Sequence, residues 1–271
     1  MITYELFNSP VGYFFRSRIR SNEVPPYSVT SHFHSSFEFI LVTEGSFSLV
    51  VNGQTERLLP GDSALILPYS VHSFLFDNDT PFRFWLVTFS KNYVNTFSRS
   101  MENHYGSGVV FRLSDAVKRY LESEILFDEC TDLPLFVLKS GLYAIIAEYL
   151  KNIPLTKRTR SDSSGLILKI TDYVRDHYAD KLSLERMAHD LGYSYSYLSH
   201  SFKSLFSLSF TSYVNLYRVD SAEADLLGTD LAIVEIAEKN GFSSIRNFNY
   251  VFRNFKGVSP REYRSMHGAV L

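Results

Sequence analysis

Cysteine is almost absent from this sequence of 271 residues, where Cys130 is the only one. A lone thiol cannot form a disulfide within the chain, which agrees with a reducing cytoplasm. No apolar run approaches the roughly 18 residues that a membrane span needs. Residues 1–15 also lack the basic start of a secretory signal. We therefore expect a cytoplasmic protein without a membrane partner.

The patterns of common catalytic sites are missing as well. We find no nucleophilic triad, no glycine loop that cradles phosphate and no paired-cysteine metal site. This absence favours a protein that is not an enzyme. Apolar residues are plentiful, at 45% of the chain with 15% aromatic residues, so packed cores can form.

One sequence pattern occurs twice in the last third of the chain. Its first half recurs 49 positions later, with Leu182, Ala188, Gly192, Tyr193 and Ser194 matched by Leu231, Ala237, Gly241, Phe242 and Ser243. Its second half recurs 50 positions later, with Leu198, Phe202, Lys203, Ser209 and Tyr213 matched by Phe248, Phe252, Arg253, Ser259 and Tyr263. The copies differ by one inserted residue, which indicates that one supersecondary unit has been reused.

Each copy predicts two helices joined by a tight turn. Apolar residues at helical spacing form the first helix of the first copy: Leu184, Met187, Ala188 and Leu191. Gly192 suits the turn, Ser194 is the expected N-cap of the second helix, and Leu198 and Phe202 are its buried residues. The second copy repeats these parts with Gly241 in the turn, Ser243 as the cap, and Phe248 and Phe252 buried.

Two such units predict a double helix-turn-helix domain. An amphipathic helix at about 211–227 would join them, so that one chain could present two recognition helices to major grooves about 34 Å apart. The outward residues of the two recognition helices are Ser196, Ser199, His200, Lys203, Ile245, Arg246, Asn249, Tyr250 and Arg253. The alternative is that these side chains are the solvated faces of ordinary helices.

Residues 165–266 resemble the AraC/XylS transcription regulators. The strongest match lies in the second copy, in Glu235-Ile236-Ala237, Gly241-Phe242, Phe248, Phe252-Arg253, Gly257-Val258-Ser259-Pro260 and Tyr263-Arg264. Ser207 departs from the pattern, because the family usually has a glycine there. The resemblance implies promoter binding, with bases contacted by Ser196, Ser199 and His200 in one helix and by Ile245, Arg246, Asn249 and Tyr250 in the other. Since arginine can bind guanine and asparagine adenine, the second helix is expected to discriminate more strongly.

Charge is distributed unevenly over this domain. Residues 165–238 contain six basic and eleven acidic side chains, whereas residues 239–271 contain six basic and one acidic. Because neutralised phosphates supply much of the affinity for DNA, the second unit is expected to make most of the phosphate contacts. The isolated domain should bind weakly and in a salt-sensitive way, and useful affinity should need a homodimer.

A polar stretch at 154–164 predicts a linker between two domains. Residues 1–153 form the expected effector-binding and dimerisation domain, and residues 165–271 the DNA-binding domain. Amphipathic helices are expected at Ser114–Cys130 and Leu135–Leu150, split by Pro134. They could pack on their own domain, and the resemblance adds a dimer interface, which we favour.

Residues 1 to about 95 predict a small β-barrel or jelly roll, so that the whole chain is of the α+β class. Short runs rich in aromatic and branched residues are the expected strands: Phe37–Val42, Phe47–Val51, Ser63–Leu67, Val71–Phe76 and Phe82–Phe89. Asn52-Gly53 is a strong hairpin signal.

Within this region the order of residues is similar to the cupin barrel signature. It runs through His32, His34, Glu38, Gly45, Pro60-Gly61-Asp62, Pro68 and His72, although the signature's early glycine and its asparagine at Phe76 are missing. Three imidazoles and a carboxylate could hold a divalent metal, or they could line an effector pocket. We expect effector binding by His32, His34, Glu38 and His72, with no bound metal and no cofactor. The resemblance also suggests that Trp85 stacks on a sugar, although a tryptophan of the core is the alternative.

The resulting hypothesis is a homodimeric regulator that senses a sugar and activates a carbohydrate operon, with RNA polymerase as a possible partner. A competing hypothesis is a metal-dependent cupin enzyme fused to a DNA-binding domain. A third is a constitutive DNA-binding protein whose barrel is a scaffold for dimerisation.

Overall fold

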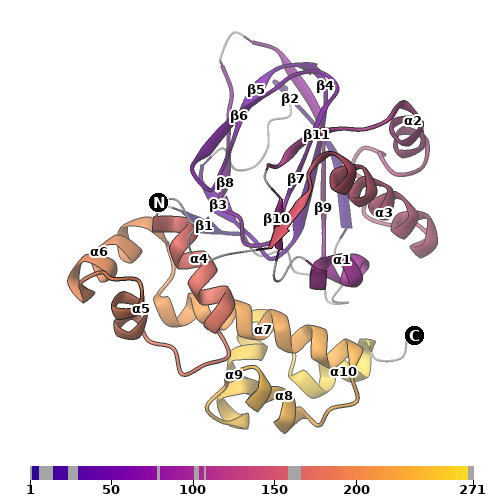
Figure 1. The fold of residues 1–271 in the computed structure, drawn as a ribbon. Helices are drawn as coiled ribbons and strands as arrows, with labels where there is room; N and C mark the ends of the chain where they lie inside the picture. Colours follow the sequence, from indigo (N-terminus) through magenta and orange to yellow (C-terminus); the bar gives the residue numbers. More distant parts are fainter. Residues whose placement is uncertain are drawn as a thin grey trace. The chain divides into compact units, whose positions relative to one another are not determined.

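The computed structural model describes residues 2–5, 15–23, 30–77, 80–100, 104–106, 108–157 and 166–267. The chain divides into two compact units (Figure 1). One is built mainly from residues 13–162 and is rich in strands. The other is built mainly from residues 163–271, is helical, and includes residues 2–4 with β1 (Thr3–Tyr4).

The first unit contains two antiparallel sheets that face each other across a shared core (Figure 1). One sheet has the strand order β3 (His32–Phe33), β8 (His72–Leu75), β5 (Phe47–Val51) and β6 (Gln54–Leu58). The other has the order β11 (Val110–Arg112), β7 (Asp62–Ile66), β4 (Phe37–Gly45), β9 (Phe82–Phe89) and β2 (Phe15–Ser21). This arrangement confirms the predicted α+β fold with a jelly-roll-like N-terminal domain.

Alternation along β4 creates two separate cores. Successive side chains of a strand point to opposite faces. Ile40 and Val42 pack between the sheets, against apolar residues of β5 and β8, whereas Phe39 and Leu41 pack against a second cluster on the outer face. Phenylalanine rings fill much of the space between the sheets, with centroids 4.0 Å apart for Phe76–Phe82 and 4.6 Å for Phe47–Phe84.

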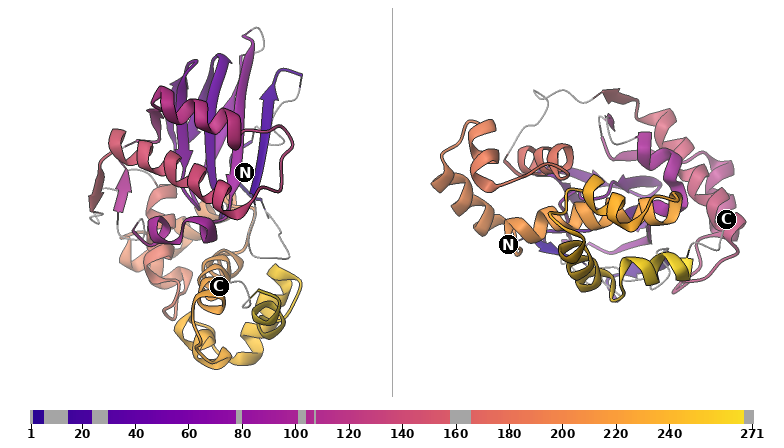
Figure 2. Two further views of the ribbon diagram at one scale, coloured as in Figure 1. Left: turned by 90° about the vertical axis from the view of Figure 1, so that its right-hand side faces the viewer. Right: turned by 90° about the horizontal axis from the view of Figure 1, so that it is seen from below.

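Helices cover the outer face of the second sheet (Figure 2). They are η1 (Lys91–Val94), α1 (Asn95–Ser100), α2 (Asp115–Glu124) and α3 (Leu135–Asn152). The helix predicted to reach Cys130 ends earlier, at Glu124. The reason is that Cys130 exchanges two backbone hydrogen bonds with Ser17, so that the end of this segment lies along the edge of β2.

Regular structure continues past the predicted start of the linker at residue 154. Leu155–Lys157 form β12, which pairs with β10 (His104–Gly106). Residues 158–164 of the predicted linker lie outside the described residues. The Asn52-Gly53 hairpin is confirmed: both residues have positive φ angles, 51° and 86°, and Val51 pairs directly with Gln54.

The second unit contains the two predicted helix-turn-helix motifs. Its helices are α4 (Leu166–His177), α5 (Leu184–Asp190), α6 (Tyr195–Leu205), α7 (Phe210–Gly228), α8 (Ile233–Lys239), α9 (Ile245–Lys256) and α10 (Pro260–His267). The motifs are α5–α6 and α8–α9, and α7 joins them. Its 19 residues make a helix about 28 Å long.

The cap of the second recognition helix corrects the sequence prediction by one residue. Ser194 caps α6 as expected, because its side chain accepts a hydrogen bond from the Tyr197 backbone N–H. In the second copy Ser244, and not Ser243, caps α9, accepting from the Asn247 N–H at 3.1 Å. The inserted residue that separates the two copies therefore lies between the turn glycine Gly241 and this cap.

The two copies also end differently, at the position where Ser207 replaces a glycine. Gly257 ends α9 with a left-handed backbone, φ 79°, which residues with a Cβ rarely adopt. The helix α6 instead ends in extended backbone at Phe206. Ile2 satisfies the polar groups there: its N–H donates to the Leu205 carbonyl at 2.6 Å, and its carbonyl accepts from the Ser207 N–H at 2.9 Å.

Two buried carboxylates of α7 hold the second motif together. Glu223 accepts hydrogen bonds from the Lys256 ammonium, at 2.7 Å, and from the Tyr263 hydroxyl. Asp225 accepts from the Lys239 ammonium at 2.6 Å and from the Asn240 amide at 2.9 Å. Because buried charges are stable only when they are paired and hydrogen-bonded, α7 fixes α8, α9 and α10 in place.

We predict that Glu223→Gln destabilises the helical unit by about 1–3 kcal/mol, because the amide leaves the partly buried ammonium of Lys256 without its ion pair. Thermal unfolding followed by circular dichroism measures the change. Asp230→Asn removes an exposed carboxylate just beyond α7 and should stay within about 0.5 kcal/mol of the parent. Equal unfolding midpoints for both variants would contradict this role of Glu223.

Candidate functional site

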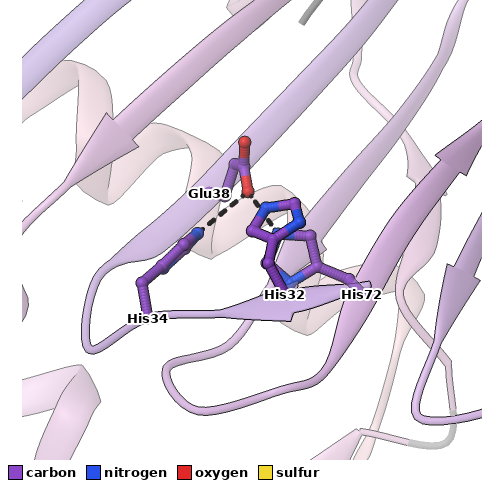
Figure 3. A group of neighbouring side chains, drawn as sticks. All are labelled: His32, His34, Glu38 and His72. Carbon is purple, nitrogen blue, oxygen red and sulfur yellow. Dashed lines mark hydrogen bonds and ion pairs between the residues drawn. The ribbon is translucent and has the colours of Figure 1, made fainter. Parts of the chain in front are cut away.

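Four polar side chains meet in the buried space between the two sheets (Figure 3). They are His32 of β3, His34 just after it, Glu38 of β4 and His72 of β8, and all four are buried. His32 and His72 are direct partners in the β3–β8 pair, while Glu38 comes from the facing sheet. One candidate ligand atom from each residue lies within 4.8 Å of all the others. The structure thus brings together four of the five predicted effector residues.

Backbone carbonyls orient the three imidazoles. The Nδ1 atom of His32 lies 2.9 Å from the Thr30 carbonyl, that of His34 lies 3.0 Å from Ser36, and that of His72 lies 2.9 Å from Ser70. A carbonyl oxygen accepts hydrogen bonds and cannot donate them, so each Nδ1 carries a proton. The Nε2 atoms of the rings are therefore left to face the centre of the cluster.

Glu38 stands at the centre of this arrangement. Its Oε2 atom lies 3.1 Å from Nε2 of His34 and 2.8 Å from Nε2 of His72. Burial alone would raise the pKa of Glu38, but the imidazoles of His34 and His72 hold that pKa far below its usual range. Burial and the neighbouring His72 lower the pKa of His32. An ionised carboxylate is consequently enclosed by imidazoles, away from bulk water.

Trp85 does not belong to this cluster, contrary to the role suggested for it. In the sheet it lies directly opposite Leu41 and Ile19, and it packs against the core under the helices. Glu38 points to the other face, opposite Thr88. Because directly opposed residues share one face of a sheet, Trp85 and Glu38 lie on opposite faces and Trp85 cannot stack on a ligand held by the four residues.

A row of arginines on β2 was missed by the sequence analysis. Arg16, Arg18 and Arg20 lie opposite Thr88, Leu86 and Phe84, whose side chains share the inner face with Glu38. Arg20 is 2% exposed and Arg18 is 7% exposed, and Glu129 forms ion pairs with Arg18 at 3.2 Å and Arg20 at 3.9 Å. The alternation of arginine with smaller residues in 16–20 is the sequence signal that reveals them.

The second candidate site is the outer surface of α6 and α9. The predicted DNA-contacting residues are exposed, apart from the half-buried Ser199: they are Ser196, His200, Lys203, Ile245, Arg246, Asn249, Tyr250 and Arg253. Tyr250 is 68% exposed, which is unusual for a large aromatic side chain. Tyr195 and Tyr197 are also about half exposed on α6 and were not predicted.

Ion pairs occupy part of the basic charge in the second motif. Lys239 and Lys256 bind the carboxylates of α7, and Arg253 lies 3.5 Å from Glu262. Among the described residues, no carboxylate pairs with Arg246. Arg246 is therefore the most available cation on α9.

None of the helices that the structure describes is long and apolar enough to span a bilayer.

Comparison with known proteins assigns both units. A family model described as the AraC-like ligand binding domain matches residues 16–129, and one described as a helix-turn-helix domain matches residues 187–266. An uncharacterised HTH-type transcriptional regulator of Staphylococcus aureus is 34% identical over 163 residues, 59% of this chain and 22% of that protein. The regulator YtdP of Bacillus subtilis is 30% identical over 150 residues, 53% of this chain and 18% of YtdP. The matched stretch thus covers about a fifth of these relatives.

Solved structures of other proteins also align with this chain. ToxT from Vibrio cholerae aligns with 94% of this chain and 99% of its own, at 14% identity and a TM-score of 0.40. The C-terminal domain of the response regulator yesN from Fusobacterium nucleatum aligns with 35% of this chain and 93% of its own, at 32% identity and a TM-score of 0.34. On the strength of its two matched domains, the chain belongs to the AraC family of transcription regulators.

Proposed function

We propose that the chain is an effector-responsive activator that binds promoter half-sites as a homodimer in the cytoplasm, and that its effector is a sugar. The observation that carries the proposal is the combination of a buried polar cluster in the ligand-binding unit with two exposed recognition helices in the other. Activation would bring RNA polymerase to the promoter as a further partner.

The exposed chemistry of α9 supports recognition of specific bases. Arg246 and Asn249 are exposed near the beginning of this helix, where residues of a recognition helix contact base edges. Arginine binds guanine and asparagine binds adenine through pairs of hydrogen bonds. Small serines on α6 would instead allow close approach and contacts through water.

Polar groups inside the sandwich support a polar effector. Hydroxyl groups of a sugar could bind to imidazoles, to Glu38 and to the arginines of β2, and the phenylalanine rings nearby would cover apolar faces. The placement of Trp85 removes stacking on that residue from the proposal. An effector changes transcription only if it binds differently to two arrangements of the protein.

The exposed face of α3 supports the homodimer. Phe136, Tyr143 and Leu150 are 85%, 40% and 38% exposed and follow one another at intervals of seven residues. Residues seven apart lie on one stripe of a helix, and apolar stripes of this kind pair with a second helix. A second copy of the chain could cover this stripe.

Selection of genomic fragments tests the proposal. Purified full-length protein is incubated with fragmented DNA, with and without a panel of sugars, and bound fragments are sequenced. We expect repeated half-sites near a carbohydrate operon, with an enrichment that one sugar changes. Enrichment that no sugar alters would contradict the sugar effector, and no enrichment under any condition would contradict the DNA-binding function.

Variants of the recognition helices give the second prediction. Arg246→Ala should weaken binding to a selected fragment by about 1–3 kcal/mol and relax the preference at one base pair. Arg253→Ala should weaken binding to all sequences alike. It should also reduce the steepness of the plot of log binding constant against log salt concentration by about one. Fluorescence anisotropy over a range of salt concentrations separates these effects.

Two further variants make the comparison specific. Lys203→Ala on α6 should cost less affinity than Arg253→Ala, because the second motif carries the excess of basic residues. Arg119→Ala removes an exposed cation of α2 in the ligand-binding unit and should leave DNA binding unchanged. A larger loss from Lys203→Ala than from Arg253→Ala would refute the assigned division of phosphate contacts.

A further inference from the structure

We propose that His32, His34, Glu38 and His72 form a binding site for one divalent transition-metal ion, such as Zn²⁺. The sequence alone led us to expect no metal here, and the hydrogen bonds of the cluster argue otherwise. The inference deepens the proposed function, and rests on it only in taking this cluster as the sensing site.

The first argument is the direction of the ring nitrogens. Each Nδ1–H is committed to a backbone carbonyl two residues away in the chain, at Thr30, Ser36 and Ser70. Such a bond fixes the tautomer and the orientation of a ring, and metal-ligating histidines characteristically donate their second nitrogen in this way. The three Nε2 atoms are thereby prepared as ligands.

The second argument is that two Nε2 atoms converge on one oxygen of Glu38. In a neutral ring whose Nδ1 is protonated, Nε2 has a lone pair and no proton. The Nε2 atoms of His34 and His72 nevertheless lie 3.1 Å and 2.8 Å from the same oxygen of Glu38, which is also an acceptor. The contact of His72 also lacks the angles of a hydrogen bond. The charge of Glu38 is therefore stabilised only with positive charge among these atoms, supplied either by protons on the two Nε2 atoms or by a metal ion that the Nε2 atoms and Glu38 coordinate together.

The third argument is the set of donors and its fit to an ion. Imidazole nitrogens with one carboxylate oxygen suit Zn²⁺ and other first-row divalent ions. Two ligand atoms at about 2.1 Å from an ion are at most about 4.2 Å apart, so the observed limit of 4.8 Å needs only small inward movements. Both β3–β8 and the facing β4 contribute ligands, so a bound ion would link the two sheets.

The site would leave a role for the effector. One carboxylate neutralises half the charge of a divalent ion, and four protein ligands leave room for a further oxygen ligand on an ion that accepts five or six. A hydroxyl or carboxylate oxygen of the effector could take that position. Burial of all four side chains would exclude competing ligands from bulk water.

Metal titration of the full-length protein tests the proposal. After treatment with a chelator, the protein is titrated with Co²⁺, followed by visible absorption, and then with Zn²⁺ in competition. The number of metal ions bound per chain is measured by inductively coupled plasma mass spectrometry. We expect one ion per chain and ligand-field bands typical of nitrogen and oxygen ligands. Glu38→Gln and His72→Gln should each weaken binding at least about 100-fold, because even changes behind the ligands cost about 10–100-fold.

His189→Gln is the matched control, because it removes a histidine whose side chain is 90% exposed on α5 and should bind metal like the parent. Circular dichroism and gel filtration establish that each variant is folded, and Glu38→Gln and His72→Gln provide independent tests if one of them is not. Weak, substoichiometric binding by the parent would overturn the proposal. So would equal binding by the parent and both cluster variants, which would place the metal elsewhere.

The same samples separate this inference from the proposed function. DNA affinity of the metal-free and metal-loaded protein is measured on a selected fragment. Stoichiometric metal that changes DNA affinity supports both the site and its sensing role. Stoichiometric metal without DNA binding under any condition supports the metal site and contradicts the proposed function. DNA binding without stoichiometric metal supports the proposed function and contradicts the metal site.

Discussion

The N-terminal unit depends on how one buried carboxylate is compensated. Glu38 projects from β4 into the space between two sheets, where water cannot solvate its charge. Three imidazoles face this carboxylate. His32 and His72 belong to the opposite sheet, and His34 follows β3 in the chain. Compensation of the charge of Glu38 therefore also links the two sheets. Aromatic packing between the sheets adds apolar stability but does not require any particular ligand. The polar cluster is thus the part of the sandwich where we propose that a ligand binds.

The helical unit follows the same physical rule with a different outcome. In α7, Glu223 and Asp225 are buried carboxylates, but each has a lysine and a further hydrogen-bond donor from the second motif. Their charges are satisfied within the fold, and these contacts join α7 to α8, α9 and α10. These ion pairs engage Lys239 of α8 and Lys256 of α9, so that sequence composition overstates the basic charge that the second motif can offer to phosphates. The guanidinium of Arg246 is exposed on the surface that we propose contacts DNA bases.

Much of this could be predicted from the sequence, because repetition and alternation are local patterns. The two motifs, the cap at Ser194, the hairpin at Asn52-Gly53 and the central strands are confirmed. The shift of the second cap to Ser244 was missed because two serines stand side by side and the position of the insertion was unknown. The strand β2 was missed because its arginines look solvated, and only pairing with β9 turns them inward. Trp85 lies on the face of the sheet that the helices cover. This placement is likewise set by strand register, which a single run of residues does not reveal.

The central claim is that the Nε2 atoms of His34 and His72 converge on Glu38 to coordinate a metal ion together with His32. Nitrogen NMR of full-length protein labelled at histidine tests this most directly, since protonated, lone-pair and metal-bound ring nitrogens have different chemical shifts. With Zn²⁺ added, the account predicts protonated Nδ1 and metal-bound Nε2 in His32, His34 and His72, assigned through single His→Gln variants. If both nitrogens of His34 and His72 instead remain protonated in the presence of Zn²⁺, the imidazoles are themselves the cations and the account is contradicted.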